Sequence, residues 1–107
     1  MNARDASRKS PPPFSALRAF EAVGRLGGIR RAATDLGLDH AVVSRHLRSL
    51  EDWAGIALVN RQRTGRLLTV EGELYHRRIS AALEEISQAS TELLNAANNG
   101  LLKIWCM

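Results

Sequence analysis

The chain is short and basic, and its length and composition exclude several classes of protein. Its 107 residues leave room for one small domain with an extended element attached. They include 15 Lys and Arg against 11 Asp and Glu. A single Cys excludes an internal disulfide, no apolar run approaches the roughly 18 residues of a membrane span, and the N-terminus has no apolar signal segment, so we expect a cytoplasmic protein.

The positive charge is concentrated in the first two thirds of the chain. Residues 1–67 contain twelve Lys and Arg against six Asp and Glu, a balance of +6, whereas residues 68–107 contain three against five, a balance of −2. Thirteen of the fifteen cations are Arg, whose planar guanidinium suits phosphate and guanine. This distribution favours nucleic-acid binding, because a solvated basic surface explains the total charge but not its clustering.

Residues 1–13 form a polar leader that we expect to be disordered. Arg4, Arg8 and Lys9 precede three consecutive prolines, which favour an extended polyproline conformation. A plain leader is a better interpretation than a basic arm that touches DNA phosphates.

A first helix is predicted to start near Ser15, which can cap it, and to end at the glycine pair 27–28. Leu17, Phe20 and Val23 recur at helical spacing and should face inward, as in an amphipathic helix.

Residues 29–52 read as two helices joined by a tight turn. Ala32, Ala33 and Leu36 give the first of them a small apolar face. Gly37 stops that helix, because glycine enters the left-handed conformation without steric cost. Asp39 can then cap the next helix by accepting hydrogen bonds from its first backbone N–H groups. The pattern is typical of a helix-turn-helix.

The second helix of this motif has two distinct faces. Val43, Leu47 and Leu50 fall on one stripe and should face inward. The outward stripe is small near its N-terminus and then basic, as a helix in a DNA major groove requires for close approach and for reaching base edges or phosphates. We expect the following residues to contact DNA here: His40, Ala41, Ser44, Arg45 and Arg48.

Two cations occupy the first turn of the preceding helix. Arg30 and Arg31 stand where the helix dipole disfavours positive charge. Because the first helix of a helix-turn-helix crosses the DNA backbone, a phosphate is the natural partner. Solvated arginines remain an equally good interpretation.

Two short apolar runs, 56–59 and 67–69, flank a polar tip that contains glycine. They predict a small β-hairpin, or wing, that carries Arg61, Arg63 and Arg66. Three arginines within six residues on a loop tip rarely have a packing role, so contact with phosphates or the minor groove is the preferred interpretation.

A long helix is predicted over residues 69–98, capped by Thr69. Its roughly 29 residues would span about 43 Å, more than so small a domain can cover. A heptad-like seam recurs along it at spacings of 4, 3, 4, 3 and 4, with Ser90 as its one polar position, and such a seam requires a partner helix. The apolar positions, which we expect to mediate dimerisation, are Ile79, Leu83, Ile86, Leu93 and Ala97.

The sequence has no signature of catalysis or of a cofactor. His40, His46 and His76 lack the spacing of metal ligands, and there is no phosphate-binding glycine loop and no nucleophile paired with a base. We therefore expect neither an enzyme nor a metal site.

Residues 14 to about 104 resemble the N-terminal part of LysR-type transcriptional regulators. The motifs that carry the resemblance are FSALRAFEAV, AATDLGLDHAVVSRHLRSLE, GIALVNR and LTVEGE, in that order and at the family's spacing. Four positions depart from the family pattern: Gly28 replaces a capping serine, His40 a glutamine, and Val59-Asn60 the Phe-Glu before the wing arginine.

The resemblance implies a mainly α fold, with a winged helix-turn-helix of three helices and a β-hairpin over residues 14–68. It also implies a linker helix over 69–98 that pairs two subunits antiparallel. Residues 99–107 would be the start of a ligand-sensing domain, so we expect no small-molecule effector to bind the residues present.

Two functions are then compatible with the sequence. The first is a homodimeric regulator that binds inverted-repeat operator sites in double-stranded DNA. The second is a protein-interaction module in which the long helix pairs with related regulators. The first is preferred, because an interaction surface would be rich in aromatic and aliphatic side chains, whereas the outward stripe carries Ser44, Arg45 and Arg48.

Overall fold

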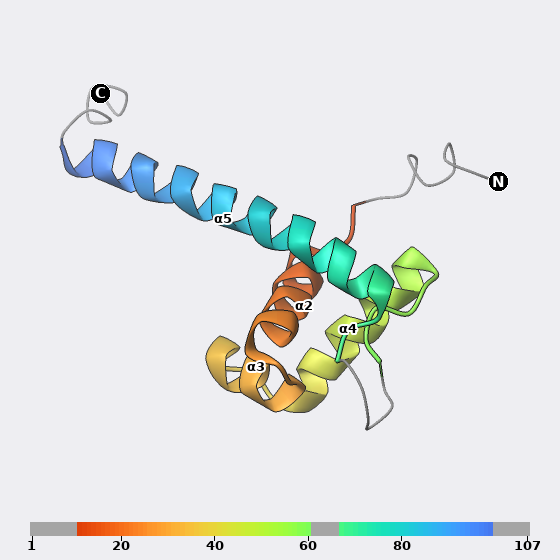
Figure 1. The fold of residues 1–107 in the computed structure, drawn as a ribbon. Helices are drawn as coiled ribbons and strands as arrows, with labels where there is room; N and C mark the ends of the chain where they lie inside the picture. The colour runs from red at the N-terminus through yellow and green to blue at the C-terminus, as the bar shows by residue number, and fades with distance from the viewer. Residues whose placement is uncertain (1–10, 61–66, 100–107) are drawn as a thin grey trace.

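In the part of the chain that the structure describes, four helices surround a small apolar core, and one of them extends far beyond it (Figure 1). The computed structural model describes residues 11–60 and 67–99. Its helices are α2 (Phe14–Leu26), α3 (Ile29–Leu36), α4 (His40–Ala54) and α5 (Val70–Asn98). The predicted mainly α fold is confirmed, whereas most of the leader (1–10) and of the C-terminal segment (100–107) lies outside the described residues.

Helix α2 is the centre of the fold, because it packs against each of the other three helices. Its inward face is completely buried at Ala16, Ala19, Phe20 and Val23. Small side chains on this face let α3 and α4 approach closely. Leu17 is half-buried at the edge of the same core.

The start of α2 differs from the sequence prediction. Ser15 does not cap the helix, which begins one residue earlier, at Phe14. The backbone N–H groups of Ala16 and Leu17 donate to the carbonyl oxygen of Pro13 at 3.0 and 3.1 Å. Ser15 therefore lies inside the first turn, where its backbone is already helical, and Pro13 occupies the cap position without a side-chain hydrogen bond.

A single antiparallel bridge stands where the wing was predicted. Val59 pairs with Leu68, and the N–H of Asn60 donates to the carbonyl of Leu67 at 2.7 Å. Leu58, Val59 and Leu68 are buried and belong to the apolar core. Among the described residues, the strand pairing does not extend beyond this bridge, so the hairpin stays a prediction. The tip of the predicted hairpin, residues 61–66, lies outside the described residues.

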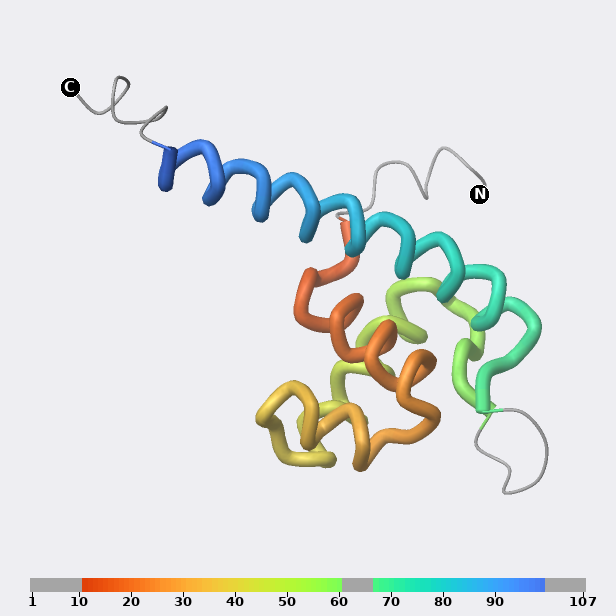
Figure 2. The backbone as a smooth tube through the Cα atoms, turned by 60° about the vertical axis from the view of Figure 1, so that its left-hand side comes forward, coloured from red at the N-terminus to blue at the C-terminus, as the bar shows by residue number. Residues whose placement is uncertain are grey.

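Helix α5 starts on the core and then leaves it. Thr69 caps it as predicted, since its Oγ1 accepts from the N–H of Gly72 at 2.9 Å. The helix is 29 residues long, and its C-terminal half projects past α2 without turning back (Figures 1 and 2). Among residues 11–60 and 67–99, none of the helices combines the length and the apolar character needed to cross a membrane.

Candidate nucleic-acid interface

The turn between α3 and α4 is built by the two residues that the sequence singled out. Gly37 adopts the left-handed conformation (φ 69°) and ends α3, and the N–H of Leu38 donates to the carbonyl of Ala33 at 2.9 Å. The side chain of Asp39 then accepts from the N–H of Ala41 at 3.3 Å. These bonds fix the angle between the helices and satisfy groups that a helix end leaves open.

The inward stripe of α4 holds this helix against the core. Val43, Leu47 and Leu50 are buried, with at most 1% of their surface exposed. They pack with Ala32 and Ala33 of α3 and with α2 in one cluster. A rotation of α4 about its axis would expose this stripe, so the orientation of its other face is fixed.

The opposite face of α4 is open to solvent. Ala41, Arg45 and Arg48 are exposed, Ser44 is half-buried and 55% of the His40 side chain is exposed. Within the described residues, no ion pair or hydrogen bond engages the guanidinium groups of Arg45 and Arg48. Helix α3 and the N-terminal part of α4 lie on the side of the domain away from α5 (Figures 1 and 2). The arrangement presents small side chains and unpaired cations to whatever binds there.

His40 lies at the edge of this face, beside the residue that caps its own helix. Its Nδ1 is 3.5 Å from the Asp39 carboxylate, too far for a good hydrogen bond. His40, Asp39 and Arg30 help to line a shallow surface hollow of about 240 Å³ between α3 and the turn.

The two arginines at the start of α3 behave differently. Arg31 reaches back to donate from Nη1 to the carbonyl of Leu26 at 3.4 Å, at the C-terminal end of α2, where the helix dipole favours a cation. Arg30 is exposed, and in the described part of the chain its guanidinium has no partner. Arg30 is thus the more available of the two for an external anion.

The base of the wing is tied to α4 by a carboxylate whose role the sequence analysis did not identify. Oε2 of Glu51 accepts from the N–H groups of Leu58 and Val59 at 2.8 and 3.0 Å. Residues 61–66 follow directly, so Arg61, Arg63 and Arg66 lie outside the described residues. Glu51 therefore holds the segment that leads into the wing against the helix that carries Arg45 and Arg48.

A buried glycine, Gly72, lets the start of α5 pack closely against the segment that precedes the wing. A Cβ on Gly72 would collide with the carbonyl oxygen of Leu58. Thr69 adds a bond from its hydroxyl to the carbonyl of Ala57 at 2.9 Å. The start of α5 is thus packed directly on the segment that precedes the wing. The sequence signal for this contact was the glycine inside a helix.

The described residues contain no cluster of three or more His, Cys, Asp or Glu that could hold a metal ion. The surface that these residues assemble is an exposed helical face with small and basic side chains.

Comparison with known proteins agrees with this geometry. Residues 14–73 match the family model for bacterial regulatory helix-turn-helix proteins of the lysR family. The chain is 35% identical over 96 residues to the glycine cleavage system transcriptional activator of Escherichia coli K12, covering 90% of this chain and 32% of that protein. It is 40% identical over 82 residues to the transcriptional regulator TrpI of Pseudomonas aeruginosa, covering 77% of this chain and 28% of that protein.

Solved structures with the same fold include two complexes with DNA. The BenM_DBD/catB site 1 DNA complex superimposes with a TM-score of 0.72 at 26% identity, covering 79% of this chain and 96% of that one. The CbnR_DBD–DNA complex gives a TM-score of 0.67 at 27% identity, covering 79% and 98%. The chain spans about a third of the length of the curated relatives it matches. On the family model and these relatives, the chain belongs to the LysR family and contains its helix-turn-helix DNA-binding domain.

Proposed function

We propose that this chain acts as a sequence-specific, DNA-binding regulator of transcription that reads its operator with α4. The exposed face of that helix is the observation that carries the proposal. Its N-terminal part is small enough to approach base edges, and Arg45 and Arg48 are available for guanine or phosphate. His40, Ala41 and Ser44 complete the contact surface. A regulator of this kind works in the cytoplasm and needs no catalytic group.

Phosphate contacts would orient α4 in the groove. Arg30 is the first candidate, since it lies at the N-terminus of α3 with its guanidinium exposed. Arg31 would contribute only after giving up its long bond to Leu26. We expect Arg61, Arg63 and Arg66 to make further backbone or minor-groove contacts from the wing. Such contacts set register and affinity but carry no sequence information.

The proposal includes a homodimer formed through α5. Ile86, Leu93 and Leu94 are 49%, 57% and 64% exposed, and each Ile or Leu side chain fully removed from water contributes about 1.5–3 kcal/mol. A second copy of α5 is the natural cover. The seam reads the same in both directions about position 88, so an antiparallel pair places Leu83 opposite Leu93 of the partner subunit, and Ile79 opposite the partner's Ala97.

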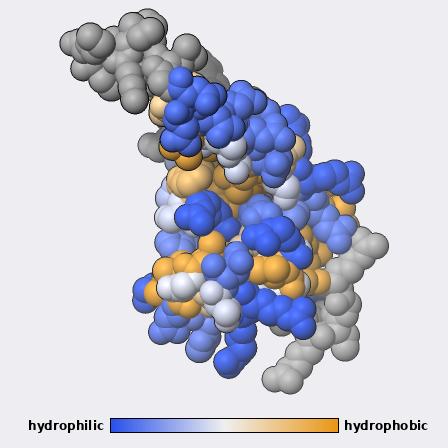
Figure 3. Space-filling model, turned by 90° about the vertical axis from the view of Figure 1, so that its left-hand side faces the viewer, coloured by the Kyte–Doolittle hydropathy of each residue, from blue (hydrophilic) through white to orange (hydrophobic). Residues whose placement is uncertain are grey.

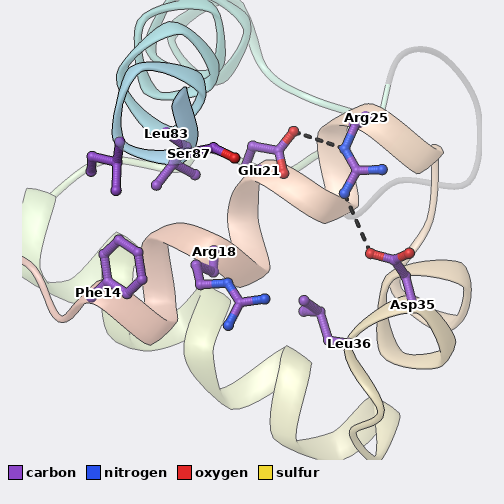
Figure 4. Close-up of a pocket in the computed structure, with 9 residues that line it drawn as sticks. Phe14, Arg18, Glu21, Arg25, Asp35, Leu36, Leu83 and Ser87 are labelled. Carbon is purple, nitrogen blue, oxygen red and sulfur yellow. Dashed lines mark hydrogen bonds and ion pairs between the residues drawn. The ribbon is translucent and has the colours of Figure 1, made fainter. Parts of the chain in front are cut away.

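A hollow of about 240 Å³ beside α5 supports this antiparallel arrangement. Phe14, which is 52% exposed, lies across it from Leu83 (Figure 4), and Ile86 also lines it. Arg25 closes another side through bonds to Glu21 and Asp35 at 2.9 and 3.4 Å. Figure 3 shows hydrophobic surface beneath α5 between hydrophilic residues. The antiparallel register brings the partner helix's Leu93 to this hollow, where it would contact Phe14.

The alternative, a module that acts only by pairing α5 with related regulators, leaves the exposed face of α4 without a role. That face carries two arginines and no Phe, Tyr or Trp, unlike the core of a protein–protein interface.

The proposal is tested by replacing one arginine on this face and one elsewhere. Arg45→Ala should weaken binding to the selected operator by about 1–3 kcal/mol and relax the preference at one base pair. Arg78→Ala removes the same charge from an exposed position on α5 and should leave that preference unchanged. Fluorescence anisotropy with the operator and with single-base variants measures both. Equal effects of the two substitutions would mean that α4 does not read the bases.

A further inference from the structure

Beyond the contacts of Thr69 and Gly72 at its start, α5 is joined to α2 by a ring fitted against a glycine. The imidazole of His76 enters the space beside Gly24 of α2. A Cβ at position 24 would come closer than 3.0 Å to two atoms of that ring and lie 3.0 Å from a third. With the His76 ring in place, no residue other than glycine at position 24 therefore lets α2 and α5 approach this closely.

Three further contacts hold the ring. Nε2 of His76 lies 3.0 Å from the carbonyl oxygen of Glu21, to which its N–H donates. The ring meets Phe20 edge-on, with centroids 5.7 Å apart, and the Ser80 hydroxyl lies 3.4 Å from the same nitrogen. The bond to Glu21 is directional, so it fixes where α5 crosses α2 as well as how closely.

The crossing angle matters because α5 is a long lever. At about 1.5 Å per residue, the 22 residues from His76 to the end of α5 at Asn98 span about 33 Å, and a change of about 10° at His76 moves that end by about 6 Å, nearly two base-pair steps of DNA. In a dimer joined through α5, that angle decides the distance and rotation between the two copies of α4.

We propose that His76 is a positioning residue which, with Gly24, sets the spacing of the two half-sites that the dimer reads. The inference rests on the proposed function, since it requires a dimer joined through α5. A purely structural role for His76 would affect stability and would weaken binding to every DNA spacing alike. A positioning role changes the discrimination between spacings and leaves contact with one half-site intact.

The test uses duplexes that carry two copies of the selected half-site, separated in steps of one base pair, and a duplex with a single half-site. Gly24→Ala is the first variant. In helix α2, alanine alone would be stabilising by about 1 kcal/mol relative to glycine, so a disturbance must come from displacement of the His76 ring. His76→Phe is the second variant, because it keeps an aromatic ring but cannot donate to Glu21. Gly28→Ala is the control, since it makes the same change where nothing lies within 4 Å.

We expect both variants to change the affinity ratio between the best spacing and its neighbours by about fivefold or more, the lower end of couplings between distant sites. Affinity for the single half-site should match that of the unaltered protein, as should the complete spacing profile of Gly28→Ala. Melting followed by circular dichroism identifies any variant that does not fold. An unchanged profile in either folded variant would overturn the inference, and so would an equal loss on all duplexes. A flat profile for the unaltered protein would instead refute the proposed dimeric function, and this inference with it.

Discussion

The contact between Glu51 and the base of the wing provides a sharp test of how α4 and the wing are held together. One carboxylate oxygen accepts two backbone N–H groups, those of Leu58 and Val59, at 2.8 and 3.0 Å. A hydrogen bond to a charged group contributes about 1.5–3 kcal/mol and a neutral one about 0.5–1.5 kcal/mol. Glu51→Gln keeps an acceptor oxygen but removes the charge, so we expect a loss of about 2 kcal/mol in the free energy of unfolding.

The neighbouring carboxylate offers a matched control. Asp52 is exposed and has no hydrogen-bond or ion-pair partner within the described residues. Asp52→Asn removes the same charge and should change the free energy of unfolding by less than about 0.5 kcal/mol. For a domain of this size, 2 kcal/mol corresponds to a fall in Tm of roughly 8–16 °C, which thermal and urea unfolding both detect. If Glu51→Gln were no less stable than Asp52→Asn, this carboxylate would not be what anchors the wing.

Three further substitutions test separate parts of the account. Ile86→Asp introduces an unpaired charge into the middle of the α5 seam, which is costly to bury; it should yield monomers in sedimentation with helical content retained, and a persisting dimer would place the interface elsewhere. Gly72→Ala should lower the free energy of unfolding by about 1–3 kcal/mol in urea titrations, because the new methyl group meets the Leu58 carbonyl; an unchanged midpoint would contradict this packing. Arg30→Ala should weaken all DNA sequences alike and lower the salt dependence by about one unit, whereas a sequence-selective loss would assign it to base reading.

The features that could be predicted from the sequence depend on neighbours in the chain. Gly37 ends α3 and Asp39 caps α4 through bonds that span a few residues, and Thr69 caps α5 in the same way. The inward stripe of α4 follows from helical periodicity alone. The error at Ser15 has the same local origin, because the carbonyl of Pro13, two residues before Ser15, accepts the first N–H groups of the helix.

The features that the sequence did not indicate join residues far apart in the chain. His76 and the carbonyl of Glu21 are separated by 55 positions, and nothing in the local sequence tells that Gly24 opens a space for that ring. The bond from Leu58 and Val59 to Glu51 depends on how the chain leaves α4. Contacts of this kind follow from the packing of complete helices, whereas periodicity reports only which side of each helix is apolar.

Selection of bound sites from random duplex DNA, at a stated salt concentration, tests the central claim most directly. The account predicts an enriched inverted repeat, with two half-sites separated by about one helical turn, 10–10.5 base pairs, or a multiple of it. Selection with Arg45→Ala should relax one position in each half-site. Recovery of no preferred sequence, or of a single site without two-fold symmetry, would contradict the claim that this chain reads DNA as a homodimer through α4.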